Sequence, residues 1–287
     1  MGMIRRSLIL NTIARLTRWT GVTGGATCFR NHLLGPYLRA VNYHWTAEVH
    51  RERFERHLVY FKSAFECVDQ AGLTQFLRHG AVPTRPLLIV SFDDGYRNNF
   101  DVATPLLEKH GIPGWFFVVA RACNPEPTVV GGPLNTRFCM DWDQLCDLQA
   151  RGHVVGCHTY HHRNVGTIAH DELKREIVEA KSVLEQRLAE PINAFCFPYG
   201  TSDCFSEQSL ELIRQHYSFA FHNFPGHVRP FHSPLSIGRM PCEPHWHLDV
   251  IRFRLSGLID MRYKGSLSRY DTMLKRLTSS SELPGLS

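Results

Sequence analysis

The alternation of short apolar runs with helical patterns constrains the fold of this chain more than any other feature. Residues 87–92 read Leu-Leu-Ile-Val-Ser-Phe, a nearly continuous apolar run that is typical of a strand buried on both faces. Further strands are predicted at residues 115–119, 154–157, 194–197 and 219–221. Helices are predicted at residues 102–110, 141–150, 170–189 and 210–217. Strands that alternate with helices pair in parallel, so the sequence predicts an α/β fold, either a barrel or a doubly wound sheet.

The composition is that of a globular protein with a sizeable core. The chain has 287 residues, of which 43% are hydrophobic and 21% charged, and one α/β barrel of roughly 200–250 residues would use most of it. The net charge of +5 comes from lysines and arginines scattered along the chain, which argues against a nucleic-acid-binding surface. The nine cysteines include no C-x-x-C pair, so reduced thiols are expected rather than a disulfide framework or a thiolate zinc site.

The two ends of the chain are expected to lie outside the main domain. Residues 1–40 are predicted to form an N-terminal extension, residues 41–265 the main domain and residues 266–287 a partly disordered tail. The apolar stretch after Arg5 and Arg6 is soon interrupted by polar residues, which makes it too short and broken for a signal peptide or a transmembrane helix. We therefore expect a cytoplasmic protein. Its N-terminal segment is either an amphipathic helix at a membrane surface or a helix packed on the body.

Three polar clusters each follow a predicted strand directly. They are Ser91-Phe92-Asp93-Asp94-Gly95, His158-Thr159-Tyr160-His161-His162 and Phe197-Pro198-Tyr199-Gly200. The carboxyl ends of parallel strands all face the same way, so these clusters should converge at one end of the fold. The sequence therefore predicts a single site that is built from all three.

Asp93 and Asp94 are neighbours at the end of a strand. Two adjacent carboxylates raise one another's pKa, and a cation relieves that conflict. If Asp94 ligates a metal ion, it stays ionised, and Asp93 is free to accept a proton. The alternative interpretation is an ordinary Asp-Asp-Gly turn without an ion.

His158 and His162 are four residues apart, so one helical turn or a compact loop brings both imidazoles to the same side. Zinc accepts imidazole nitrogen readily, and two histidines with one carboxylate leave positions open for water and substrate. His161 lies between them in sequence and is expected to point elsewhere. The alternative is that these histidines are ordinary core or surface residues.

The stretch Pro198-Tyr199-Gly200 is either a simple turn or part of a binding site. A backbone N–H at such a turn can donate to a developing oxyanion, which needs a fixed donor and no side-chain chemistry. The three clusters together favour the second interpretation.

In this order the clusters resemble the motifs of the polysaccharide deacetylase family (carbohydrate esterase family 4, with the NodB homology domain). The first family motif, T-F-D-D-G, is similar to residues 91–95, and the second, H-[ST]-x-x-H, is matched by residues 158–162. The third, R-x-P-[FY]-G, is matched at residues 198–200. The resemblance runs from about residue 40 to residue 255. It implies a distorted (β/α) barrel of parallel strands with helices outside, and a catalytic role for the domain at residues 41–265.

The resemblance also implies a role for each matched residue. Asp93 would be the catalytic base, and Asp94, His158 and His162 would be the metal ligands. The backbone N–H of Tyr199 would bind the oxyanion, and substrate would contact the turn formed by Pro198, Tyr199 and Gly200. The cofactor would be a divalent metal ion, with zinc as the first choice and cobalt or manganese as alternatives.

The chain departs from the family pattern at three points. Cys196 stands where the third motif has its arginine, and both the fourth motif, D-x-x-D-W, and the late L-x-x-H are absent. The motifs therefore identify neither the residue that tunes the base nor the acid that protonates the leaving amine. The candidates for the acid are His232, His245 and His247, and the alternative for each is an ordinary loop histidine.

The sequence thus predicts a metal-dependent hydrolase that removes acetyl groups from N-acetylated sugars of a polysaccharide or a glycan precursor. Such an enzyme acts on a carbon–nitrogen bond. Two alternatives stay open, namely a deformylase or other amidase on the same barrel and a non-catalytic glycan-binding relic. The expected partner is a carbohydrate and not a nucleic acid, and the N-terminal segment is the candidate for peripheral membrane contact.

Overall fold

Parallel strands form the centre of the molecule, in a computed structural model that describes residues 12, 14, 16–20, 35–123 and 138–280. The strands in this part are β1 (Leu38–Tyr43), β2 (Glu66–Cys67), β3 (Leu87–Phe92), β4 (Gly114–Val118), β5 (Val154–Cys157), β6 (Ala194–Cys196), β7 (Phe219–His222) and β8 (Ile237–Pro241). β1 pairs with β3 on one side and with β8 on the other. Seven strands therefore close into a barrel in the order β1-β3-β4-β5-β6-β7-β8.

The short strand β2 lies outside this ring. It pairs with Leu87 and Leu88 at the start of β3, whereas β4 pairs with the last three residues of the same strand, Val90 to Phe92. The same edge of β3 therefore pairs first with β2 and then with β4, and this arrangement distorts the barrel. The parallel barrel confirms the fold class expected from the sequence.

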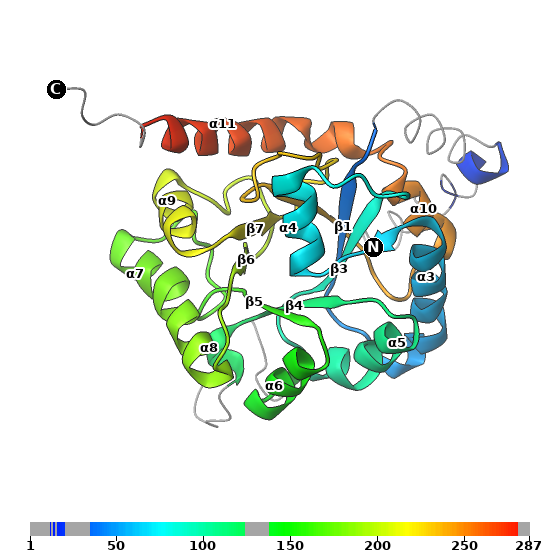
Figure 1. Ribbon diagram of the computed structural model, residues 1–287, viewed down its shortest axis with the longest axis horizontal. Coiled ribbons are helices and arrows are strands. Elements are labelled where there is room, and N and C mark those ends of the chain that lie inside the picture. The colour runs from blue at the N-terminus through cyan, green and yellow to red at the C-terminus, as the bar shows by residue number, and fades with distance from the viewer. Residues whose placement is uncertain (1–11, 13, 15, 21–34, 124–137, 281–287) are drawn as a thin grey trace.

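Helices surround the barrel, as Figure 1 shows. They are α3 (Arg51–Ala64), α4 (Gln70–His79), α5 (Thr104–Lys109), α6 (Trp142–Ala150), α7 (His170–Lys174), α8 (Ala180–Leu188), α9 (Glu207–His216), α10 (Leu248–Leu255) and α11 (Lys264–Ser280), with short 3₁₀ turns η1 (Glu48–His50), η3 (Ala120–Cys123) and η6 (Asp260–Tyr263). There are also two π-helical segments. η2 (Asn99–Ala103) directly precedes α5, and η5 (Arg175–Glu179) joins α7 to α8. No helix of the described residues is long and apolar enough to cross a membrane.

One end of the barrel is closed by apolar side chains. The first inward-facing residues of several strands belong to one buried cluster, which includes Leu38, Leu87, Ala194, Phe219 and Ile237. Helix α4 adds Leu73, Phe76 and Leu77 to this cluster, and the indole N–H of Trp115 donates to the carbonyl of Val68 just before that helix, at 2.9 Å. Since these are the amino-terminal ends of the strands, the carboxyl ends are left for polar side chains.

The predicted elements agree with the structure, with shifts at their ends. The strands at residues 87–92 and 154–157 are confirmed in full, and the helix expected at residues 141–150 begins one residue later because Asp141 is its N-cap. The helix expected at residues 102–110 begins earlier, in η2. The long helix expected at residues 170–189 contains the π-helical segment η5, which its apolar periodicity did not indicate.

The boundaries expected for the main domain need correction at both ends. Residue 40 lies within β1, whose residues are all buried, so the barrel begins before the predicted boundary. Helix α11 continues to Ser280, and its Tyr270 and Leu274 are buried in the core, so residues 266–280 belong to the packed body and not to a tail. Residues 281–287 and most of the predicted N-terminal extension lie outside the described residues.

Candidate functional site

Three loops at the carboxyl end of the barrel bring the predicted clusters together. Asp93 follows β3, residues 158–162 follow β5 and residues 198–200 follow β6. Four residues of these loops have a φ angle between 62° and 71°, namely Asp94, Thr159, His162 and Tyr199. A positive φ costs a non-glycine residue about 1–3 kcal/mol, and residues of this kind concentrate at functional sites.

Asp94, His158 and His162 form a cluster that can hold a metal ion. Oδ1 of Asp94 lies 3.2 Å from Nε2 of His162 and 3.5 Å from Nε2 of His158. One potential ligand atom of each residue lies within 4.8 Å of the other two. Asp94 and His158 are buried, and the side chain of His162 is 11% exposed. Two nitrogens and one carboxylate oxygen facing one another are a donor set that suits zinc and related cations.

The hydrogen bonds around this cluster fit a cation. Nδ1 of His158 lies 2.8 Å from the carbonyl oxygen of Cys196, so this nitrogen carries the proton and Nε2 keeps its lone pair for a ligand bond. Burial lowers the pKa of His158 to about 4, so the ring is neutral near pH 7. Within the described residues, Oδ1 of Asp94 is buried without a hydrogen-bond donor. A buried carboxylate oxygen of this kind is costly unless a positive charge meets it.

Asp93 faces a different partner, the guanidinium of Arg239 on β8. Nη1 of Arg239 donates to Oδ1 of Asp93 at 2.6 Å, and Nη2 donates to Oδ2 at 2.8 Å. Both side chains are at most 2% exposed. Burial would raise the pKa of Asp93, but the positive charge of Arg239, with a contribution from His158, holds this pKa well below its ordinary value. Asp93 is therefore ionised and fixed in orientation.

The motifs did not identify a charged partner for Asp93, and the structure provides one in Arg239. Cys196, which stands at the position of the motif arginine, lies inside the barrel with its Sγ 3.8 Å from Oδ1 of Asp93. Arg239 reaches the same carboxylate from a different strand and also donates to Ser91 and Asn223, each at 3.1 Å. The sequence did contain a signal for Arg239, because residues 237–241 read Ile-Gly-Arg-Met-Pro, with one charge in an otherwise apolar run.

The other neighbours of Asp93 come from β1 and the loop after it. Nδ2 of Asn42 donates to Oδ2 of Asp93 at 3.2 Å. Nε2 of His44 lies 3.9 Å from the same oxygen, and the His44 side chain is 41% exposed. Nδ2 of Asn99, in the π-helical segment η2, donates to the His44 carbonyl at 2.7 Å. His44 thus stands between the buried carboxylate and solvent.

The three histidines considered as acids have other surroundings. His247 is the N-cap of α10 and accepts a hydrogen bond from the Asp249 N–H. The carbonyl of His245 accepts from Arg53. His232 lies in a turn, where its N–H donates to the Arg229 carbonyl. No contact among the described residues joins any of the three to Asp93.

Tyr199 packs against His162, one of the three residues that can hold a metal ion. Its hydroxyl donates to the carbonyl of His162 at 3.0 Å, and the two rings are 4.8 Å apart. The side chain is 53% exposed. Within the described residues, the backbone N–H of Tyr199 donates to no protein acceptor. This N–H is therefore available to a ligand.

His161 points away from the cluster, toward a carboxylate buried beneath the loop. Oε2 of Glu176 accepts from the His161 N–H at 2.8 Å, and Oε1 lies 2.6 Å from Nδ1 of the His161 ring. Glu176 is 1% exposed and belongs to the π-helical segment η5. Single π turns recur near functional sites because the extra residue redirects a side chain. Glu176 is a second residue that the motifs did not identify.

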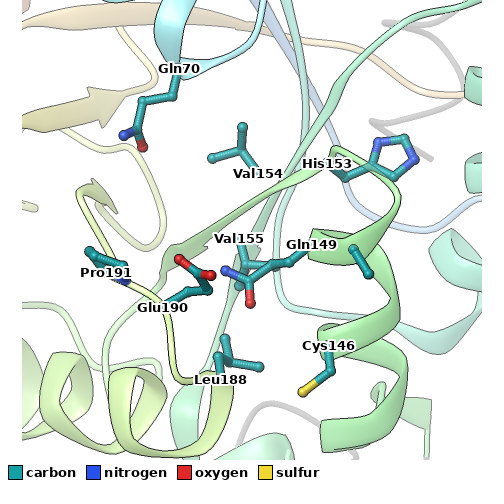
Figure 2. A pocket seen from close by; sticks show the side chains of 10 residues that line it. Gln70, Cys146, Gln149, His153, Val154, Val155, Leu188, Glu190 and Pro191 are labelled. Carbon is teal, nitrogen blue, oxygen red and sulfur yellow. The ribbon is translucent and has the colours of Figure 1, made fainter.

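A cavity of about 500 Å³ lies at the other end of the barrel. Figure 2 shows its lining, with Gln149 and Glu190 close together and Val154 between Gln70 and His153. Val154 begins β5, whereas His158 follows the end of the same strand. Since none of the lining residues belongs to the three clusters, this cavity is separate from the candidate site.

Comparisons with known proteins agree with the resemblance to the polysaccharide deacetylase family that the motifs show. The sequence profile of the polysaccharide deacetylase family matches residues 81–217. The peptidoglycan-N-acetylmuramic acid deacetylase PdaA of Bacillus subtilis is 27% identical over 132 residues, which are 45% of this chain and 43% of PdaA. The chain spans about half the length of the curated relatives it matches.

Solved structures share the fold. The Streptococcus pyogenes deacetylase PplD, in complex with acetate, has a TM-score of 0.64 at 16% identity, over 76% of this chain and 97% of PplD. IcaB from Ammonifex degensii has a TM-score of 0.64 at 24% identity, over 77% of this chain and 97% of IcaB. The barrel of parallel strands with outer helices is therefore common to all three chains.

Proposed function

Because the chain belongs to the polysaccharide deacetylase family, we propose that it hydrolyses the acetamido group of N-acetylated sugars with the help of a divalent cation. One observation carries this proposal, namely that the two adjacent carboxylates have different surroundings. Asp94 faces two imidazole nitrogens, whereas Asp93 faces Arg239 and His44. These surroundings support a role as cation ligand for Asp94 and as proton acceptor for Asp93.

Asp94, His158 and His162 are the proposed ligands. A cation bound there would polarise the acetyl carbonyl and lower the pKa of an attacking water. The two imidazoles favour zinc, and cobalt and manganese are the alternatives. The hydrogen bond from Nδ1 of His158 to the Cys196 carbonyl keeps the other ring nitrogen directed at the cluster.

Asp93 is the proposed general base. It accepts a proton from water as the water oxygen attacks the carbonyl carbon. Arg239 keeps the carboxylate ionised and holds both of its oxygens in a fixed plane, which suits a base that must meet water in one orientation. The N–H of Tyr199 is the proposed donor to the developing oxyanion.

His44 is the proposed general acid, in place of the three histidines considered from the sequence. Collapse of the tetrahedral intermediate breaks the carbon–nitrogen bond, and the leaving nitrogen must gain a proton as it departs. The His44 side chain is 41% exposed, which lets it reach substrate, and its Nε2 lies 3.9 Å from Oδ2 of Asp93. The products are acetate and the free amino sugar.

The test combines metal analysis of the purified chain with an assay of acetate released from chito-oligosaccharides. We expect Asp93→Asn to retain the metal and lose turnover, and His158→Ala to lose both. Asp101→Asn, which changes an exposed carboxylate, is the matched control. Full activity of metal-stripped protein would contradict the proposal.

The two alternatives make different predictions in the same assay. A deformylase would release formate from N-formyl sugars and little acetate from N-acetyl sugars, so a panel of acyl-sugars separates it. A glycan-binding relic would bind zinc tightly and release nothing. The contact of Arg239 with Asp93 favours an enzyme, because a relic has no need for a buried, paired carboxylate at this position.

The location of the protein is also a proposal. We propose a cytoplasmic protein, with membrane contact through the N-terminal segment as the alternative. Fractionation of native cells, with the protein followed in the supernatant and in the membrane pellet, distinguishes the two.

A further inference from the structure

We propose that Asn99 is a positioning residue, which holds the proposed general acid His44 in place beside Asp93. This inference rests on the proposed function, and it adds a residue that acts on the reaction through the main chain of another. Nδ2 of Asn99 donates to the carbonyl oxygen of His44 at 2.7 Å, and Asn99 is 0% exposed.

His44 lies where the chain leaves the barrel. At the end of β1, the Asp93 N–H donates to the Tyr43 carbonyl at 2.9 Å. Between this bond and the 3₁₀ turn η1, the main chain of residues 44–46 makes one hydrogen bond to the described part of the protein, and its donor is Asn99. The direction in which the His44 side chain leaves the backbone therefore depends on Asn99.

A π-helical turn brings Asn99 to this position. Asn99 begins η2, and its carbonyl accepts from the Thr104 N–H and also from the Thr104 hydroxyl, which lies at 3.0 Å. The Asn99 N–H donates to the Tyr96 carbonyl at 3.0 Å. The backbone of Asn99 is thus fixed on both sides. Single π turns are rare and occur frequently at functional sites.

The side-chain amide of Asn99 is only half satisfied. Its Nδ2 donates to His44, but its Oδ1 is buried and accepts from no donor in residues 35–123 and 138–280. A buried polar atom without a partner lowers stability, and an apolar side chain of similar shape avoids this cost. Folding alone would therefore favour a residue such as leucine here. The hydrogen bond to His44 explains why the position carries an amide.

The position of the acid matters for the reaction. A general acid must lie within hydrogen-bonding reach of the group that it protonates, and a displacement of about 1 Å can reduce the rate about 100-fold. Nε2 of His44 lies 3.9 Å from Oδ2 of Asp93, which is too long for a hydrogen bond that would fix the ring. The main chain at His44, and with it Asn99, therefore sets where the imidazole stands.

The experiment compares Asn99→Leu with Asn98→Leu. Asn98 is a matched control, because both polar atoms of its amide are buried and neither has a hydrogen-bond partner among the residues that the structure describes. The substrates are chito-oligosaccharides, whose leaving nitrogen must gain a proton, and 4-nitrophenyl acetate, whose phenolate leaves without one. For Asn99→Leu we expect kcat on chito-oligosaccharides to fall about 10–100-fold and kcat on the aryl ester to stay within about twofold. Asn98→Leu should behave as the wild type on both.

A purely structural role of Asn99 would give a different pattern. Partial unfolding lowers activity on both substrates alike, and urea unfolding measures it directly. We expect the midpoint of Asn99→Leu at or above that of the wild type, because the unpaired Oδ1 is gone. In a His44→Ala background, Asn99→Leu should cause no further loss on chito-oligosaccharides, because its effect passes through His44. An equal loss on both substrates, or a full further loss in the double variant, would overturn the inference.

NMR of protein with isotope-labelled histidine separates failure of this inference from failure of the proposed function. The ring signals of His44 are those that His44→Ala lacks, and we expect them to shift or broaden in Asn99→Leu and to stay unchanged in Asn98→Leu. If they do so while the wild type releases no acetate from chito-oligosaccharides, Asn99 positions His44 and the proposed function fails. If acetate is released and Asn99→Leu keeps the kcat of the wild type, the proposed function stands and the positioning role is refuted. Unchanged ring signals in a protein that releases no acetate refute both.

Discussion

Arg239 holds both carboxylate oxygens of Asp93 from inside the barrel, although 146 residues separate the two in the sequence. The pair is almost completely buried, so each charge depends on the other for compensation. The guanidinium also lies over the ring of Phe117, 5.3 Å from its centroid. The proposed base therefore belongs to a buried ion pair whose arginine packs against an aromatic ring inside the barrel.

Loss of the arginine should affect stability and activity differently in two variants. Arg239→Met leaves Asp93 buried without a partner, and we expect a loss of about 3–5 kcal/mol in the free energy of unfolding. Arg239→Lys keeps the charge but cannot hold both oxygens. For this variant we expect a folded protein whose kcat falls on the order of 100-fold with little change in KM. Urea unfolding and acetate-release kinetics measure the two effects. An Arg239→Lys protein with wild-type kcat would show that orientation of Asp93 is unimportant.

The same contact can be moved to the position that the family motif uses. In the double variant Cys196→Arg, Arg239→Ser, the guanidinium would approach Asp93 from β6, where Sγ of Cys196 now lies 3.8 Å from Oδ1. We expect this variant to recover part of the activity that Arg239→Ser alone loses. Recovery measured as kcat, with folding checked by circular dichroism, separates an electrostatic role from a requirement for β8 itself. A double variant that folds and stays as inactive as Arg239→Ser would contradict the electrostatic role.

Glu176 should act on metal affinity without touching the metal. Its carboxylate accepts from the His161 N–H and faces the His161 ring, and so fixes the loop between the two proposed histidine ligands. We expect Glu176→Gln to weaken zinc binding about 10–100-fold, as outer contacts of this kind do. Competition with a zinc-binding dye measures the affinity. Glu179→Gln, whose side chain is 63% exposed on the same helical segment, is the control and should bind zinc as the wild type does.

Zinc should stabilise the folded chain if the three proposed ligands bind it together. A ligand that binds only the folded state at 100 times its Kd raises the free energy of unfolding by about 2.7 kcal/mol. We expect a shift of this size for the wild type and for Asp93→Asn, because Asp93 is outside the ligand set. His162→Ala should show a much smaller shift. Thermal unfolding with and without zinc provides the measurement, and equal shifts in His162→Ala and the wild type would remove His162 from the site.

Local patterns in the sequence were sufficient for most of the barrel. In the helix expected at residues 170–189, the apolar residues Leu173, Ile177 and Leu184 recur at helical spacing and are all 0% exposed. Strands followed directly by polar clusters predicted that Asp94 and His162 would meet, because parallel strands share a direction. These inferences need only the period of the apolar residues and the hand of the connections.

Contacts between segments that are distant in the sequence could not be predicted from local patterns. Arg239 meets Asp93 only because β8 pairs with β1 and closes the ring, and nothing in a short window reveals that closure. Glu176 reaches His161 because a π turn adds a residue to a helix whose apolar stripe reads as regular. The three acid candidates lie late in the chain, where the family has its histidine, whereas His44 directly follows the first strand.

The buried imidazole of His57, on the outer face of the barrel, predicts a loss of stability in mild acid. Its Nε2 lies 3.0 Å from the Trp246 carbonyl and its Nδ1 lies 3.2 Å from the Tyr43 hydroxyl, which fits a neutral ring that donates from Nε2 and accepts at Nδ1. Burial lowers the pKa of His57 from 6.5 to about 4. The unfolded chain therefore binds this proton more readily than the folded chain does. The stabilising contribution is complete above pH 6.5 and is lost as the pH falls toward 4, by roughly 2 kcal/mol between pH 7 and pH 5. His57→Gln, which can still donate to the Trp246 carbonyl, should lose stability at pH 7 but show a correspondingly weaker pH dependence in urea unfolding. An unchanged pH dependence in this variant would mean that His57 is not the group that titrates.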